Sequence, residues 1–245
     1  MARTVKYKWL KLGVVAVLLL CGICWVYAAD YYHADDIAVA AMSSAADVTV
    51  EQKGNTLAFV PENAETGLIF YPGGKVEYTA YAPLMRALAD SGVLGVLVRM
   101  PLNLAVLDMN AADGIPEQYP QIKHWYIGGH SLGGSMAASH AAKNTSAYEG
   151  LVLLASYSTA DLSTFGLSVI SIYGSEDGVL NMEKYAECRR NFPTVFEEHI
   201  IEGGCHAGFG SYGPQDGDGV PTITGEEQMA KTVQLLTAFF DSVQE

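Results

Sequence analysis

Several features that would place this 245-residue chain in a specialised class are scarce or missing. It holds four cysteines, and their spacing resembles no zinc or iron–sulfur site, so the sequence predicts no metal centre and no cofactor. Only 17% of its residues are charged, and it contains no internal repeat, low-complexity tract or charge block that would mark a linker. With half of its residues hydrophobic, the chain suits one ordinary α/β domain.

Basic residues are few beyond the N-terminus. Four of the 14 lysines and arginines precede Asp30, whereas all 27 acidic residues lie at or after it, so the remainder of the chain has a formal charge of −17. Such a negative field disfavours nucleic acids and other polyanions as partners. No obligate protein partner is evident from the sequence.

The first 29 residues differ from the rest. An uncharged run of 18 residues, from Leu12 to Ala29, follows a basic stretch and precedes acidic residues. A helix rises about 1.5 Å per residue, so this run with two flanking apolar residues just crosses a hydrocarbon core of about 30 Å. We predict that residues 1–29 form a cytoplasmic basic stub and a single transmembrane anchor, which places the rest of the chain outside the cytoplasm. The alternative is a signal peptide cleaved near Ala28, which would release a secreted protein.

The remaining chain alternates between strand-like and helix-like segments. Residues 30–46 are interpreted as a tether with some helix, and residues 47–245 as the folded domain. Short apolar runs predict strands at 48–51, 56–60, 67–71, 93–98, 123–128, 151–156, 167–173 and 195–202, and helical periodicity predicts helices at 78–89, 134–143, 180–191 and 226–243. This alternation predicts a mostly parallel, doubly wound sheet with helices on both faces. The predicted strands 151–156 and 167–173 are joined by only about ten residues, too few for a folded lid, so no cap domain is expected.

The pentapeptide Gly129-His130-Ser131-Leu132-Gly133 matches the pattern Gly-x-Ser-x-Gly. It lies between a predicted strand and an alanine-rich predicted helix. A serine on such a tight turn has a strained backbone that exposes its hydroxyl above the sheet edge, and the glycines let strand and helix approach each other. We interpret this stretch as a nucleophile elbow.

An acid and a base follow two later strands. In a parallel sheet, catalytic residues gather beyond the carboxyl ends of the strands, and Asp177 and His206 both lie there. His206 can accept the proton of Ser131 through one ring nitrogen while its other ring nitrogen donates to Asp177. Glu176 is a competing acid, but the spacing from the preceding glycine favours Asp177.

The developing oxyanion needs hydrogen-bond donors. The Leu132 N–H is one candidate, and the loop after the strand 67–71 supplies a second, either Lys75 or Gly74. His130 is expected to pack within the elbow and to point away from the base.

Three other features have ordinary structural interpretations. The turn Asp216-Gly217-Asp218-Gly219 holds too few ligands for calcium and is interpreted as a solvated turn. His124, His140 and His199 lie within predicted strands or helices, where structural roles are expected. Cys188 and Cys205 could pair in an oxidising compartment, a question that sequence separation leaves open.

The order of serine, acid and histidine, each after a strand, resembles the α/β-hydrolase superfamily across residues 47–243. Five segments are similar to a bacterial branch of small, lidless hydrolases that often carry an N-terminal anchor: PGGKVEYTAYAPLMRALA, VLVRMPLNLAV, WYIGGHSLGGSMAA, IYGSEDGV and GGCHAGFGSYGPQDGDG. This resemblance implies Ser131, Asp177 and His206 as a catalytic triad. It says little about the substrate.

From these observations we expect a membrane-anchored, extracytoplasmic serine hydrolase. It would cleave a small carboxylic ester, or another acyl substrate, through an acyl-enzyme. An acyltransferase or amidase would use the same covalent intermediate. A surface-binding module that has lost catalytic activity is the alternative from another class.

Overall fold

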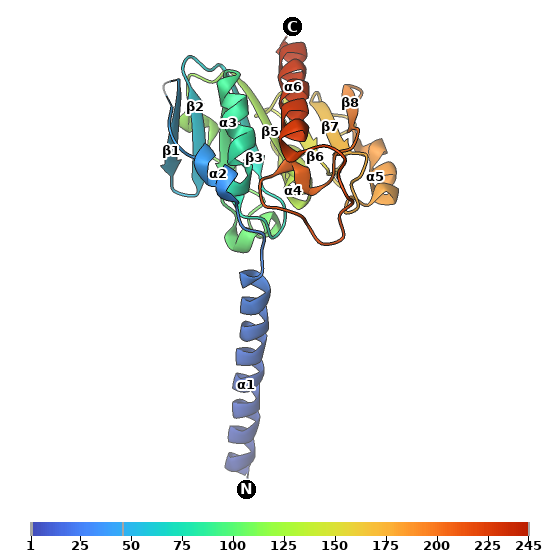
Figure 1. Ribbon diagram of the computed structural model, residues 1–245. Coiled ribbons are helices and arrows are strands. Elements are labelled where there is room, and N and C mark those ends of the chain that lie inside the picture. The colour runs from blue at the N-terminus through green and yellow to red at the C-terminus, as the bar shows by residue number, and fades with distance from the viewer. Residues whose placement is uncertain (1, 46, 245) are drawn as a thin grey trace. The chain divides into compact units, whose positions relative to one another are not determined.

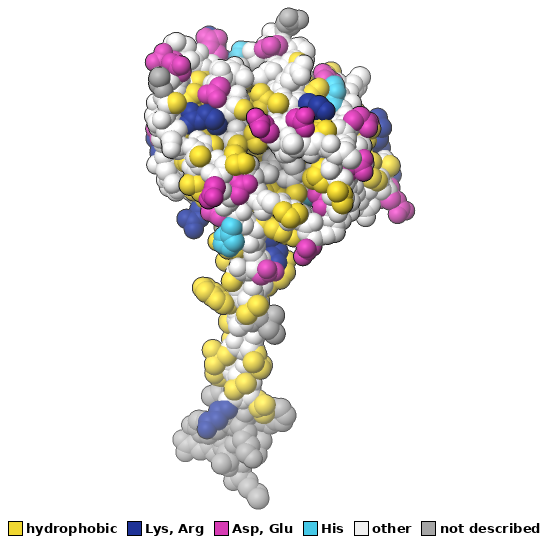
Figure 2. All heavy atoms as spheres, in the orientation of Figure 1, with side chains coloured by type: hydrophobic (Ala, Val, Ile, Leu, Met, Phe, Trp, Pro, Cys, Tyr) yellow, Lys and Arg dark blue, Asp and Glu magenta, His cyan; other side chains and the backbone are white. Residues whose placement is uncertain are grey.

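The computed structural model describes residues 2–45 and 47–244, and gives only the backbone of residues 2–10, 23 and 28. The chain divides into two units, residues 1–31 and residues 32–245. Helix α1 (Ala2–Ala29) makes up most of the first unit, and its described hydrophobic side chains are exposed (Figure 2). Among the described residues, no helix is both long enough and apolar enough to cross a membrane.

The second unit is built on one eight-stranded sheet (Figure 1). Its strands are β1 (Val48–Lys53), β2 (Thr56–Pro61), β3 (Thr66–Tyr71), β4 (Val93–Val98), β5 (His124–His130), β6 (Gly150–Leu154), β7 (Ser168–Gly174) and β8 (Phe196–Ile201). They lie in the order β1-β2-β4-β3-β5-β6-β7-β8, with β1 and β2 antiparallel to their neighbours and all other pairs parallel. The predicted α/β architecture with a mostly parallel sheet is confirmed.

Helices cover both faces of this sheet (Figure 1). The helices of this unit are α2 (Asp36–Ala41), α3 (Ala82–Asp90), α4 (Leu132–Ala141), α5 (Met182–Cys188) and α6 (Gly225–Gln244). Alternate residues of β3 enter separate cores: Leu68 and Phe70 pack in the cluster that includes α3 and α6, whereas Ile69 packs in the cluster that includes α4. A strand buried on both faces needs an apolar residue at every position, which explains the unbroken run from Gly67 to Tyr71.

The helix after β7 is shorter than predicted. The sequence predicts helix at 180–191, but α5 begins at Met182 because the Asn181 side chain accepts the Lys184 N–H and caps it. The Leu180 N–H instead donates to the Asp177 carboxylate at 2.8 Å. The residues before the helix therefore belong to the turn that carries the predicted acid.

The segment predicted as a tether is part of the compact unit from Tyr32 onward. The Tyr32 N–H donates to Lys75 O at 2.7 Å, and the Glu77 N–H donates to Tyr32 O at 2.9 Å. Further along, the Asp35 N–H donates to Ser211 O at 2.9 Å. This segment therefore connects the loop after β3 with the loop after β8.

Residues 155–167, between β6 and β7, contain no helix or strand, and all of them are described. The carboxyl ends of β5, β7 and β8 lie at one edge of the sheet because these strands are parallel. Ser131, Asp177 and His206 follow these three ends.

Candidate active site

Ser131 lies at the turn between β5 and α4, with φ +52° and ψ −122°. This is a left-handed backbone conformation, which costs a residue other than glycine on the order of 1–3 kcal/mol. Hydrogen bonds to the neighbouring strand β6 and the loop after it hold it: the Ser131 N–H donates to Leu154 O at 2.9 Å, and the Ser156 hydroxyl donates to Ser131 O at 2.7 Å. The backbone of the predicted elbow is therefore strained, and hydrogen bonds from the end of β6 hold it in this conformation.

Gly129 and Gly133 of the elbow lie so close to the backbone at the end of β3 that no side chain fits at either position. A Cβ atom on Gly129 would lie 2.5 Å from Tyr71 O, and one on Gly133 would collide with the backbone of Tyr71 and Pro72. Real Cβ atoms do not come so close to backbone oxygen. The Gly-x-Ser-x-Gly pattern thus lets the elbow pack directly against the end of β3.

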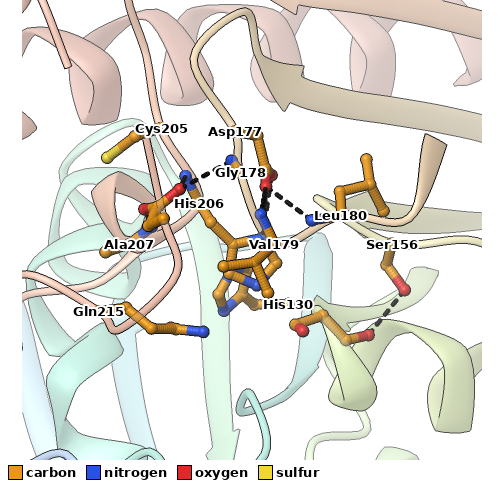
Figure 3. Close-up of polar contacts among 12 residues, drawn as sticks. His130, Ser156, Asp177, Gly178, Val179, Leu180, Cys205, His206, Ala207 and Gln215 are labelled. Atoms are coloured by element: carbon orange, nitrogen blue, oxygen red, sulfur yellow. Dashed lines mark hydrogen bonds and ion pairs between the residues drawn. The ribbon is translucent and has the colours of Figure 1, made fainter. Parts of the chain in front are cut away.

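Asp177 and His206 are in contact. His206 Nδ1 lies 2.9 Å from Asp177 Oδ2 and 3.1 Å from Oδ1, and each side chain is 1% exposed (Figure 3). The Val179 and Leu180 N–H groups also donate to Asp177, at 2.9 and 2.8 Å. An ionised carboxylate only accepts hydrogen bonds, so Nδ1 carries the proton and Nε2 of the neutral ring keeps its lone pair.

His206 Nε2 is buried and has no hydrogen-bond partner among the described residues. A hydrogen bond from the Ser131 hydroxyl to this nitrogen is therefore not formed in this structure. The ring of His130, which precedes Ser131 in the chain, has its centroid 4.5 Å from that of His206. The elbow and the histidine loop thus lie next to each other, and catalytic hydrogen bonds in ligand-free enzymes often tighten only when substrate binds.

The expectation that His130 points away from the base is wrong. Its ring packs against that of His206, and its Nδ1 lies 2.7 Å from the Tyr81 hydroxyl, which also accepts the Gly73 N–H at 3.0 Å. We assign the hydroxyl proton to the bond with His130, because the Gly73 N–H donates to the same oxygen. Burial, together with the nearby His206, holds the pKa of His130 well below its ordinary value.

The loop after β3 contains one usable candidate donor for an oxyanion. A Cβ on Gly74 would lie 3.0 Å from the Leu132 side chain, so this loop lies beside the first residue of α4. The Lys75 N–H already donates to Asn103 O at 2.8 Å, and its φ is +58°. The Lys75 N–H is therefore already engaged, which corrects the prediction that it could bind an oxyanion. The N–H groups of Gly74 and Leu132 remain as the candidate oxyanion donors.

The turn at residues 216–219 is not simply solvated, which also corrects the prediction. Both oxygens of the Asp218 carboxylate accept backbone N–H groups, and three of the four donors lie outside this turn: Gly178, His206 and Ala207. The sequence signal that could have found this contact is an aspartate between two glycines close to a candidate base. Among the described residues there is no cluster of three or more His, Cys, Asp or Glu side chains that could hold a metal ion.

The other acidic, histidine and cysteine side chains considered in the sequence analysis are not part of the Asp177–His206 pair. The Glu176 carboxylate accepts the Ser175 hydroxyl, and His124, His140 and His199 pair with Glu149, Tyr148 and Glu197. Cys188 and Cys205 are free and buried, and burial raises the pKa of the Cys205 thiol to about 11. The open question of a disulfide between them is thereby answered: this structure has none.

A strained serine on a strand-to-helix turn, at the same sheet edge as a buried aspartate–histidine pair, defines a class of α/β proteins with a nucleophile elbow. The model of the alpha/beta hydrolase family matches residues 67–230, well over half of the chain. The chain belongs to this family. No curated protein sequence matches it.

Solved structures with the same fold include several hydrolases. Dienelactone hydrolase from Anabaena variabilis has a TM-score of 0.60 at 13% identity, covering 80% of this chain and 98% of that chain. Est1E from Butyrivibrio proteoclasticus, bound to ferulic acid, has a TM-score of 0.58 at 11% identity, covering 80% and 97%. TT1662 from Thermus thermophilus has a TM-score of 0.56 at 15% identity, covering 79% and 98%. At these identities the likeness shows a shared fold, and the family match supports a hydrolase.

Proposed function

We propose that this protein is a serine hydrolase that cleaves a carboxylic ester through an acyl-enzyme. The observation that carries the proposal is the buried Asp177–His206 pair, whose Nε2 is left without a partner beside the strained elbow of Ser131. An imidazole that is oriented by a carboxylate and keeps a free lone pair is the group that a serine hydroxyl needs as its base.

In the proposed reaction, His206 Nε2 accepts the Ser131 proton while the hydroxyl oxygen attacks the ester carbonyl carbon. Asp177 stabilises the imidazolium that forms. The protonated ring then donates its proton to the leaving alcohol, and a water molecule, activated by the same nitrogen, releases the acid from Ser131. No step requires a cofactor.

The negative oxygen of the tetrahedral intermediate needs donors that are already in place. We propose the Leu132 N–H, since the N–H groups in the first turn of a helix have no acceptor within the helix, together with the Gly74 N–H. The loop contact between Gly74 and Leu132 supports this pair.

The short connection between β6 and β7 supports an open site for short or medium acyl groups or the ends of larger molecules. Among the similar structures, one protein is by name a dienelactone hydrolase, and because a lactone is a cyclic ester this name favours an ester substrate. An acyltransferase or amidase would use the same groups. Activity on p-nitrophenyl esters of increasing chain length, compared with amide substrates, would separate these reactions.

The decisive test is labelling with a serine-reactive fluorophosphonate. The folded wild-type protein should be labelled and hydrolyse esters, and Ser131→Ala should do neither. Ser139→Ala is the matched control, since Ser139 lies two turns further along α4 and its hydroxyl donates to Ser135 O within the same helix. A folded wild-type protein that resists the probe would be an inactive binding module instead.

We also propose, from the sequence pattern alone, that residues 1–29 anchor the protein in a membrane with the catalytic unit outside the cytoplasm. Four basic residues before the apolar run and the acidic residues after it support this orientation. Full-length protein should stay with membranes in alkaline carbonate, and mass spectrometry should find Leu12–Ala29 still attached. Release of a shortened chain would support signal cleavage instead.

A further inference from the structure

Asp218 joins the two loops that carry the proposed acid and base. Its Oδ1 accepts the N–H groups of Gly178 and His206, both at 3.1 Å, and its Oδ2 accepts the Ala207 N–H at 2.8 Å. Gly178 directly follows Asp177 in the chain. The Asp218 carboxylate therefore holds both the backbone beside Asp177, the proposed acid, and the backbone of His206, the proposed base.

The contact is local to the reacting groups. Nearer the sheet, the same two loops are already joined by the Glu176 N–H, which donates to Gly204 O at 2.8 Å. Asp218 adds a second connection on the far side, at the residues that bear the imidazole and follow the carboxylate. The Glu176–Gly204 hydrogen bond on one side of the Asp177–His206 pair and the Asp218 hydrogen bonds on the other restrict how the loops after β7 and β8 can rotate against each other.

The donors around Asp218 suit a carboxylate and not a cation. Hydrogen bonds from backbone N–H groups to a charged acceptor are shorter and stronger than those between neutral groups. Burial alone would raise the pKa of the Asp218 carboxyl, but the N–H groups of Ala207, Gly178, His206 and Gly219 together outweigh burial and lower it. Asp218 therefore stays ionised at neutral pH.

We propose that Asp218 is a positioning residue that keeps the His206 ring aligned between Asp177 and Ser131. The inference rests on the proposed function, because it assigns Asp218 a role through the proposed base. Asp218 does not touch the reacting atoms. It acts by fixing the backbone from which the imidazole projects, and a misplacement of about 1 Å at a reacting group can lower the rate on the order of 10²-fold.

The test compares Asp218→Asn with Asp216→Asn, its exposed neighbour in the same turn. An asparagine keeps the size of the side chain, but its NH₂ group must face at least one of the backbone N–H donors. We expect Asp218→Asn to lower kcat for ester hydrolysis on the order of 10²-fold while KM changes little. Asp216→Asn should leave both values at the wild-type level.

A second comparison separates positioning from general damage. If Asp218 acts through His206, Asp218→Asn should lower activity in the wild-type background and have no further effect in His206→Ala. An equal loss in both backgrounds would overturn the proposal, as would a wild-type kcat in Asp218→Asn. If Asp218→Asn fails to fold, Asp218→Ser replaces it, since a hydroxyl still accepts one N–H group, and the same outcomes apply.

The two proposals fail in different ways. Absence of fluorophosphonate labelling in the wild-type protein, or full activity in His206→Ala, would reject the serine hydrolase itself. Normal labelling and an inactive His206→Ala, together with an unaffected Asp218→Asn, would reject only the positioning role.

Discussion

At the scale of single residues, the site contains two imidazoles in contact, those of His130 and His206, of which only His206 is proposed to carry charge during the reaction. Burial and the neighbouring His206 lower the pKa of His130, so His130 is neutral at physiological pH. In the proposed reaction, a neutral His130 would not repel the imidazolium formed at His206. The Tyr81 hydroxyl holds His130 in place and also holds Gly73, one residue before the proposed oxyanion donor.

Replacing Tyr81 with phenylalanine tests this connection. The change leaves the buried Gly73 N–H and His130 Nδ1 without their partner, which should lower the free energy of unfolding by about 1–3 kcal/mol. Ester hydrolysis should also slow, because this hydroxyl holds both the loop proposed to supply an oxyanion donor and the elbow. Urea unfolding and kcat/KM are the measurements.

Tyr78→Phe is the matched control for that variant. The Tyr78 hydroxyl accepts a hydrogen bond from the Gln52 side chain at 3.2 Å on the exposed surface, where water can replace the lost group. Equal effects of Tyr78→Phe and Tyr81→Phe would contradict a special role for Tyr81.

At the scale of elements, the extended chain before α2 contacts two loops of the candidate active site at once. Tyr32 pairs with the loop after β3 through two backbone hydrogen bonds, which fix both Lys75 and Glu77. The Tyr32 hydroxyl accepts the Asp216 N–H at 3.1 Å, and its ring packs against Tyr212 with centroids 5.5 Å apart. The segment therefore supports the candidate site without containing any of the residues proposed for catalysis.

Two truncated proteins test the importance of this segment. A chain that begins at Asp30 keeps every contact of Tyr32 in the compact unit and should hydrolyse esters as the full chain does. A chain that begins at Asp47 loses these contacts and should have a lower kcat/KM and a lower unfolding midpoint. Indistinguishable kinetics and stability in the two proteins would show that the segment is dispensable.

At the scale of the whole molecule, acidic side chains are spread over the surface of the compact unit, while basic ones are sparse on the face shown in Figure 2. The interior holds neutral imidazoles in two places. His130 lies in the site, and His140 lies on α4 with its Nε2 3.0 Å from the Tyr148 hydroxyl. Burial, as the largest cause, lowers the pKa of both histidines.

These two histidines predict how stability depends on pH. In the unfolded chain each takes up a proton near its ordinary pKa of about 6.5, whereas the folded protein keeps the rings neutral to lower pH. Their contribution to stability is therefore complete above about pH 6.5 and declines as the pH falls towards 5, by up to about 1.4 kcal/mol per pH unit for each histidine. Urea unfolding between pH 7.5 and 5 measures this slope.

His140→Gln should make the slope smaller, since one of the two histidines is removed away from the site. Constant stability across this range, or greater stability at pH 5 than at pH 7.5, would contradict the assignment of buried neutral rings. The carboxyls with lowered pKa, such as that of Asp218, affect stability only at lower pH, where they take up protons.

The sequence by itself determined the architecture and the three residues proposed for catalysis. Continuous apolar runs such as β3 can be satisfied only by burial on both faces of a sheet, and the glycines around Ser131 mark a turn that no larger residue could form. Because parallel strands end at the same edge, the places of Asp177 and His206 along the chain were enough to predict that they gather there. These inferences depend on local periodicity and chain order, which can be read from sequence.

Only the tertiary structure decided which hydrogen-bonding groups and rings around the candidate site already have partners. Three contacts join segments that no local pattern relates: the hydrogen bond from Lys75 to Asn103, the ring contact between His130 and His206, and the hydrogen bond from the His206 N–H to Asp218. The directions of these N–H groups depend on how loops of irregular backbone close over the sheet edge. Periodicity carries no information about such closure, because each loop conformation is selected by its contacts with the other loops.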